Sequence, residues 1–182
     1  MRVFMSFVLM VFCATAQPDP RNRLTFSGGW SRQIADPFER LTATGLGLTY
    51  GYRVHKHVEA EGGVLTALDP TSEICSHSGC VDVGDHYFWF PFGVRFIAPL
   101  GRAEFSAGGG GLFEKYTVAS PFPGGGPLPR HGWGGYFAGS AAVALDRSRH
   151  FWLGVTPRWF LANPAYARDR WFQVPSEFSV RF

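Results

Sequence analysis

Hydrophobic and polar residues alternate along most of this chain with a period of two. In the carboxy-terminal segment, Phe178, Val180 and Phe182 share one parity, while Ser179 and Arg181 share the other. Because successive side chains of a β-strand point to opposite faces, each such segment predicts a strand with one apolar and one polar face. The chain contains eight segments of this kind: residues 24–32, 42–54, 58–68, 86–97, 101–114, 132–145, 150–161 and 171–182.

The connections between these segments alternate between short and long. The short ones are residues 55–57, 98–100 and 146–149, and the long ones are residues 33–41, 69–85, 115–131 and 162–170. A transmembrane up-and-down barrel has this alternation because its turns face one compartment and its loops face the other. We therefore predict an all-β fold, an eight-stranded antiparallel up-and-down transmembrane β-barrel, with both chain ends on the short-turn side.

The two faces of the predicted strands differ in charge. The apolar face is rich in Phe and Trp, whereas the polar face carries acidic and basic residues in nearly equal number, with Gly and Ser between them. A balanced set can neutralise itself inside a narrow lumen, so we expect the polar face to point inward and the apolar face to contact lipid. The predicted lumen charge network comprises Arg53, Glu59, Glu61, Arg95, Arg102, Glu104, Arg158, Glu177 and Arg181.

Aromatic residues near the strand ends support the outward direction of the apolar face. Trp30, Trp133 and Trp159 are expected near the long-loop ends, and Tyr52 and Phe182 near the short-turn ends, where membrane barrels carry aromatic girdles. The alternative is that these side chains form the core of a soluble sandwich or of a lipocalin-like barrel with an apolar interior.

The amino end has the features of an export signal. Arg2 is followed by an apolar run to Cys13, and Ala14-Thr15-Ala16 matches a small-x-small cleavage site. We predict a signal peptide over residues 1–16 with cleavage after Ala16, a short segment over residues 17–23, and the barrel over residues 24–182. Lipid attachment at Cys13 is the alternative, but Phe12 stands where that signal requires a small residue.

The alternating pattern and the terminal Phe182 together resemble the small bacterial outer-membrane β-barrel proteins of the eight-stranded, surface-protein type. This resemblance implies a location in the cell outer membrane of a bacterium with two membranes, and recognition of Phe182 by the barrel assembly machinery. It also implies contact with outer-membrane lipids and lipopolysaccharide and surface loops whose partner is unknown. Phosphates of lipopolysaccharide are expected partners for the arginines of the loops and loop-side rims, Arg32, Arg40, Arg130, Arg168 and Arg170.

Two cysteines lie close together in the second long connection. In an exported protein, Cys75 and Cys80 are expected to form a disulfide. The alternative is a metal site formed by the two thiolates and His77, with Asp82, Asp85 or His86 as a fourth ligand.

No catalytic, cofactor-binding or metal residue is predicted elsewhere. The net charge of +3 comes without a basic stripe, which argues against nucleic-acid binding. The glycines at 108–111 are not followed by the Lys-Ser/Thr of a nucleotide loop. Lipid A-modifying enzymes also use eight-stranded barrels, but His86 and His131 have no adjacent Ser in the same strand, and His150 is followed by Phe151.

We therefore predict a non-enzymatic outer-membrane barrel with a side-chain-filled lumen that displays surface loops. The alternatives are a narrow channel or carrier of small apolar solutes, a lipid A-modifying enzyme and a soluble lipocalin-like binder.

Overall fold

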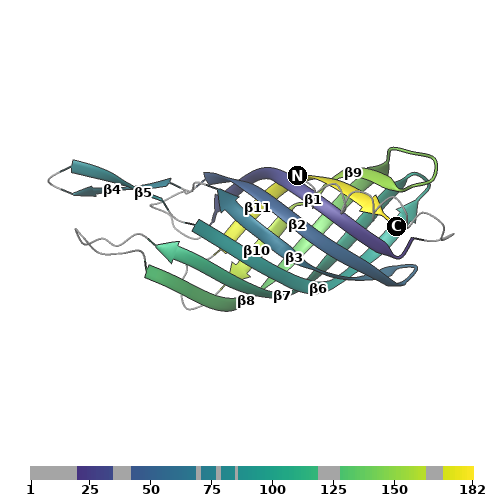
Figure 1. Cartoon of the computed structure of the whole chain (residues 1–182), viewed down its shortest axis with the longest axis horizontal. Helices are drawn as coiled ribbons and strands as arrows, with labels where there is room; N and C mark the ends of the chain where they lie inside the picture. The colour runs from purple at the N-terminus through teal and green to yellow at the C-terminus, as the bar shows by residue number, and fades with distance from the viewer. Residues whose placement is uncertain are drawn as a thin grey trace, which may run out of the picture.

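A closed ring of antiparallel strands forms the protein (Figure 1). The computed structural model describes residues 20–34, 42–68, 71–76, 79–84, 86–118, 128–162 and 170–182. No described segment is a helix of the length and apolarity needed to cross a membrane. The strands are β1 (Asn22–Gln33), β2 (Thr42–His55), β3 (Val58–Leu68), β4 (Thr71–Ser76), β5 (Gly79–Gly84), β6 (His86–Leu100), β7 (Ala103–Val118), β8 (Leu128–Ala144), β9 (Phe151–Val155), β10 (Arg158–Ala162) and β11 (Arg170–Arg181).

The ring closes between the first and last strands. β1 pairs with β11 over eleven residues from Arg23 opposite Arg181 to Gln33 opposite Trp171. The amide of Asn22 donates to the carbonyl of Phe182 at 2.9 Å, and the amide of Phe182 donates back at 3.0 Å. β9 and β10 act as one barrel strand, so the ring has eight strand positions, which we call staves. This confirms the predicted architecture.

The seventh stave is interrupted at Thr156 and Pro157, which the sequence pattern did not reveal. The register is the same on both sides of the gap, because Val155 pairs with Ser176 and Arg158 pairs with Gln173. Pro157 has no amide hydrogen and lies across from the segment that holds Pro175. In this register Pro175 lies opposite Thr156, so the two prolines belong to adjacent pairs and together remove donors from the ladder without shifting its register.

The second long connection contains a hairpin that was predicted only as a loop. β4 and β5 pair antiparallel with each other, and in Figure 1 they extend beyond the end of the barrel. Their backbone register sets Cys75 opposite Cys80. The side chains of this hairpin lie outside the described residues, so the disulfide and the alternative metal site stay predictions.

The second short turn lies later in the chain than predicted. Residues 98–100 continue β6, and the turn is formed by Gly101 and Arg102. Gly101 has a φ of +61°, a conformation that glycine adopts without steric cost. Arg102 is therefore an exposed turn residue and not a member of the lumen network, so this part of the prediction is wrong.

Exposure along the strands follows the predicted alternation. Phe96 and Trp133 are each 65% exposed on the outer surface, whereas Glu59 is 1% and Arg95 is 3% exposed in the interior. The charged face therefore points inward and the apolar face outward, which is the arrangement of a membrane barrel and the reverse of a lipocalin.

Candidate functional site

Ion pairs fill the half of the barrel interior that lies toward the short turns. Five acidic side chains (Glu59, Glu61, Glu104, Glu114 and Glu177) face five basic ones (Arg23, Arg53, Arg95, Arg158 and Arg181) in the interior. The equal numbers make the described interior neutral when every group is ionised. Glu114 lies in the other half of the interior. We call the remaining residues of this set the ion-pair network.

Glu104 connects three arginines at the short-turn end of the network. Its carboxylate lies 2.6 Å from the guanidinium of Arg181, 3.4 Å from that of Arg53 and 3.9 Å from that of Arg23. Arg23 also reaches Glu59, at 2.5 Å. These contacts join strands β1, β2, β3, β7 and β11 across the lumen, so the network ties opposite walls of the barrel together.

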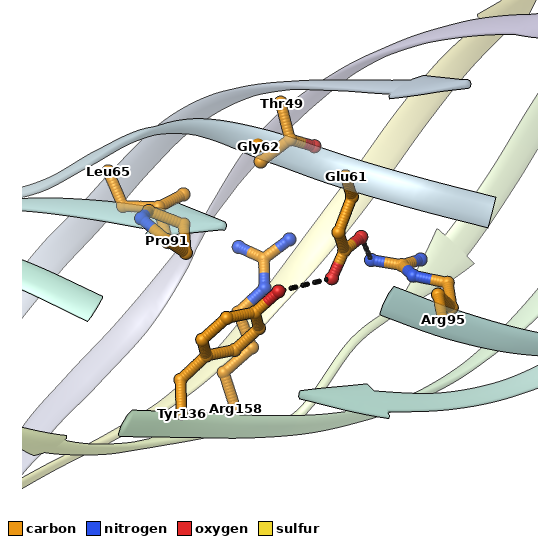
Figure 2. A pocket seen from close by; sticks show the side chains of 8 residues that line it. All are labelled: Thr49, Glu61, Gly62, Leu65, Pro91, Arg95, Tyr136 and Arg158. Atoms are coloured by element: carbon orange, nitrogen blue, oxygen red, sulfur yellow. Dashed lines mark hydrogen bonds and ion pairs between the residues drawn. The ribbon is translucent and has the colours of Figure 1, made fainter. Parts of the chain in front are cut away.

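Glu61 and Glu177 each hold an arginine in the middle of the barrel. Glu61 accepts from Arg95 at 2.6 Å and from the hydroxyl of Tyr136 at 2.8 Å, and Figure 2 shows these two groups reaching the carboxylate from two different strands, Arg95 from β6 and Tyr136 from β8. Glu177 is ion-paired with Arg158. Gly93 leaves room for the Tyr136 hydroxyl, since a Cβ atom there would lie 2.7 Å from it.

Little free space remains around this part of the network. The cavity that Glu61, Arg95, Tyr136 and Arg158 line has a volume of about 10 Å³, which is about what one water molecule requires. The ionised groups around this cavity therefore contact one another and do not face a water-filled pore.

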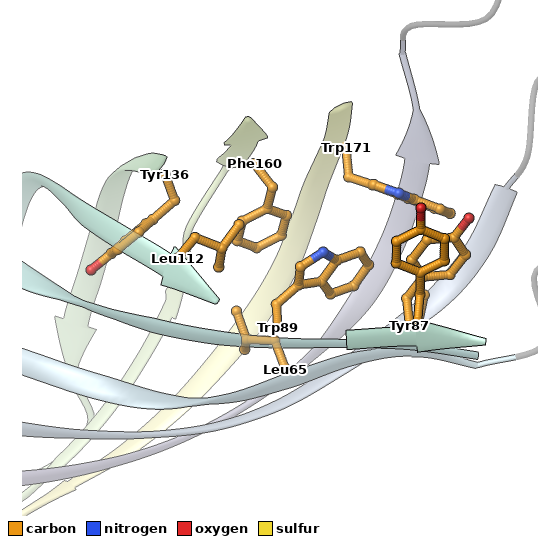
Figure 3. Close-up of a cluster of buried hydrophobic side chains, with 9 residues drawn as sticks. Leu65, Tyr87, Trp89, Leu112, Tyr136, Phe160 and Trp171 are labelled. Atoms are coloured by element: carbon orange, nitrogen blue, oxygen red, sulfur yellow. The ribbon is translucent and has the colours of Figure 1, made fainter. Parts of the chain in front are cut away.

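The other half of the interior, toward the long connections, is closed by an apolar and aromatic cluster. This aromatic plug consists of Leu65, Ala67, Tyr87, Trp89, Leu112, Tyr116, Phe160 and Trp171. Trp89 is fully buried, and its ring stacks on Phe160 with centroids 5.1 Å apart and meets Trp171 edge-on at 5.4 Å (Figure 3). Its indole N–H donates to Glu114 at 2.7 Å, and that acid lies within the plug, between Leu112 and Tyr116 on β7.

Eight of the nine residues predicted for the lumen network lie in the interior; Arg102 is the exception. Arg23 was missed because the first strand was expected to begin at Leu24. Its parity is the same as that of Thr25 and Ser27, which also face inward, so extending the alternation by one residue would have found it. Phe182 was predicted as an assembly signal; the structure shows its backbone paired with Asn22, and the signal itself stays a prediction.

The outer surface carries aromatic side chains near the long-connection end, as the girdle prediction expected. Trp159 stacks on Phe137 with centroids 4.7 Å apart and contacts Phe172, which meets Trp30 edge-on. Trp133 contacts Phe113 at 4.9 Å. Tyr52 is exposed and lies near the short-turn end of β2.

The described residues assemble no catalytic arrangement around the candidate histidines. His86 and His131 are both exposed, His86 pairs across the sheet with Thr117, and the ring of His131 contacts Phe113. Within the described ranges, no three His, Cys, Asp or Glu side chains are grouped so as to hold a metal ion. Of the arginines expected near lipopolysaccharide, Arg32, Arg130 and Arg170 are described; Arg40 and Arg168, like the signal peptide, lie outside the described residues.

Comparison with solved structures shows the fold of small outer-membrane β-barrels. The structure is similar to Neisserial surface protein A (TM-score 0.70, 9% identity, 88% of this chain and 97% of that chain covered). It is also similar to Ail, the attachment invasion locus protein of Yersinia pestis (TM-score 0.60, 9% identity, 90% and 98% covered). A third is the N-terminal β-barrel domain of OprF from Pseudomonas aeruginosa (TM-score 0.61, 8% identity, 90% and 100% covered). No protein-family model matches the sequence, and no curated protein is significantly similar to it.

Proposed function

We propose that this chain is a non-enzymatic integral protein of a bacterial outer membrane, in which a closed barrel anchors surface loops. This proposal rests on the distribution of apolar and charged side chains, which is the reverse of that in a soluble protein. Large apolar side chains such as Phe92, Phe96 and Leu153 are half to two-thirds exposed around the outer wall, while ionised side chains are buried inside. In water such a surface would be costly, whereas in a bilayer it is the expected one.

The cellular context of the proposal comes from the two chain ends. The signal peptide over residues 1–16, with cleavage after Ala16, would deliver the chain across the inner membrane. The barrel assembly machinery would then recognise the strand that ends in Phe182. Short turns would face the periplasm and long connections the outside.

The proposed role of the long connections is contact with envelope components or an external partner. They include the β4–β5 hairpin, and Arg32, Arg130 and Arg170 lie at the strand ends from which they emerge. Arginine binds phosphate and sulfate groups through paired hydrogen bonds. One protein of this fold, Ail, has been crystallised with the heparin analogue sucrose octasulfate. We therefore propose anionic groups, those of lipopolysaccharide first, as the partners of this end.

Labelling from within the bilayer tests the membrane proposal directly. A photoreactive probe confined to the acyl chains is expected to modify Phe90 and Leu153 and to spare Arg95 and Glu104, with sites read by peptide mass mapping. The reason is that the first pair faces outward at 38% and 49% exposure, while the second is buried at 3% each. Barrel kept unfolded in urea supplies the control, because a chain outside the bilayer should react at none of the four positions. Reaction at Arg95 or Glu104 in the folded barrel, with Phe90 and Leu153 spared, would contradict the orientation.

A narrow channel or a carrier of small apolar solutes is the second candidate, because the interior is lined with charge. The aromatic plug argues against a pore: Leu65, Trp89, Leu112 and Phe160 are each at most 1% exposed and come from four different staves. The purified barrel is therefore expected to give no steady conductance in a planar bilayer. Stable single-channel steps from a preparation shown by heat-modifiable gel mobility to be folded would instead favour the channel.

A further inference from the structure

A groove runs along the outer wall of the barrel at its short-turn end. It has a volume of about 450 Å³ and is open to the outside over most of its extent. The small side chains of Ala103, Ala141 and Ser176 lie between the larger ones of Phe105, Val143 and Leu153. Ala103 pairs across the sheet with Val143, and Val143 pairs with Leu153. The adjacent strands β7, β8 and β9 therefore contribute these side chains to the groove. The groove is thus an apolar depression in a surface that otherwise carries large side chains.

Arg102 lies at the short-turn end of this groove. It directly precedes Ala103, and its Nη2 atom donates to the carbonyl oxygens of Ala144 at 3.0 Å and Leu145 at 3.2 Å. These contacts hold the guanidinium against the neighbouring turn. Its partners are uncharged, it has further N–H donors, and its side chain is exposed. Arg102 is therefore a positioned cation whose charge no described acid neutralises.

The turn that joins β8 to β9 adds two more cations. Arg147 and Arg149 are exposed there, and neither forms an ion pair within the part of the chain that the structure describes. The acid of this turn, Asp146, is engaged by the backbone: it accepts from the amides of Phe151 at 2.9 Å and His150 at 3.2 Å. Slight burial raises the pKa of Asp146, but these backbone hydrogen bonds outweigh it and bring the pKa below its usual value.

We propose that this face of the barrel binds one anionic phospholipid, with an acyl chain in the groove and the phosphate at Arg102, assisted by Arg147 and Arg149. The inference rests on the membrane residence proposed above. A soluble polyanion has no apolar part to fill the groove, and a neutral lipid has no net negative charge to match the three arginines. Leu100 (69% exposed) and Leu145 (52% exposed) beside the two turns place these cations at the boundary between acyl chains and headgroups.

Native mass spectrometry of the folded barrel, released from detergent with added lipid, tests the site. Phosphatidylglycerol and phosphatidylethanolamine with identical acyl chains are compared. The wild type is expected to retain one phosphatidylglycerol at concentrations where phosphatidylethanolamine is lost. The Arg147→Gln/Arg149→Gln variant and the Arg102→Gln variant should each weaken retention about tenfold, as expected for loss of charge-assisted hydrogen bonds. Lys56→Gln/Lys115→Gln removes two exposed charges that lie outside this site and should change nothing.

A second pair of variants tests the groove without altering charge. Ala141→Leu fills the groove and should also reduce retention, whereas Ala107→Leu, outward on the same sheet but outside the groove, should not. Equal retention of both lipids, or loss of retention in neither arginine variant, would overturn the inference. Heat-modifiable mobility of each variant keeps the two proposals distinguishable. A barrel that is folded and needs detergent yet shows no lipid preference refutes only the lipid site, while a barrel soluble without detergent refutes membrane residence.

Discussion

Replacing Glu104 with glutamine is expected to lower the free energy of unfolding by about 3–5 kcal/mol. The carboxylate contacts Arg181, Arg53 and Arg23, and its side chain is 4% exposed. Its loss leaves Arg181 and Arg53 without the carboxylate that they contact, in a space from which most water is excluded, while Arg23 keeps its ion pair with Glu59. Urea titration of the barrel folded in lipid vesicles measures the change.

Two further variants separate lost charge balance from general damage. Arg102→Gln, two residues away on the turn, loses only two hydrogen bonds to carbonyl oxygens, one part-buried and one exposed, and should cost about 1 kcal/mol. Adding Arg181→Gln to Glu104→Gln restores equal numbers of acids and bases, so the double variant should be more stable than the sum of the single changes implies. A Glu104→Gln barrel as stable as the Arg102→Gln barrel would show that the network does not hold the walls together.

Replacing Trp89 with alanine is expected to cost about 3–5 kcal/mol. The indole is fully buried, stacks on Phe160, contacts Trp171 and Tyr87, and donates to Glu114. Removing it opens a cavity at the centre of the aromatic plug and takes a hydrogen-bond donor from a buried carboxyl group. The same urea titration measures the loss of stability.

Two controls identify which part of the Trp89 side chain matters. Trp89→Phe retains most of the aromatic volume but not the N–H donor, so it should be intermediate between wild type and Trp89→Ala. Trp133→Ala removes a tryptophan that is 65% exposed on the outer wall and should cost only about 1 kcal/mol, because its main loss is the contact with Phe113. If the Trp89 and Trp133 variants lost the same stability, the interior plug would have no special role.

The ion-pair network and the aromatic plug each fill one half of the barrel interior. The ion-pair network joins opposite walls at the short-turn end, and the plug fills the long-connection end with side chains that need few hydrogen bonds. A lumen filled this way leaves the outer wall, the short turns and the long connections as the surfaces on which function can depend. The proposed loop contacts and the phospholipid site lie on those surfaces.

Much of the fold could be predicted from the sequence because a barrel strand is a local pattern. Each stave alternates in polarity within itself, so β3 was predicted with the bounds that the structure has, and most other staves to within four residues. The interruption at Pro157 was missed because parity is unchanged across it. The β4–β5 hairpin was missed because it pairs only with itself and lies outside the regular alternation of long and short connections.

The number of staves, the parity of each and the direction in which charged and apolar side chains point could all be predicted from the sequence. These properties follow from the two-residue repeat of a strand and from the cost of placing charge in lipid. The folded structure sets which acid meets which arginine, because Glu104 and Arg181 are 77 residues apart and meet through the stagger of the closed ring. It also decided that Arg102 lies on a turn, since one glycine at positive φ moved the end of a strand past the point where alternation alone would place it.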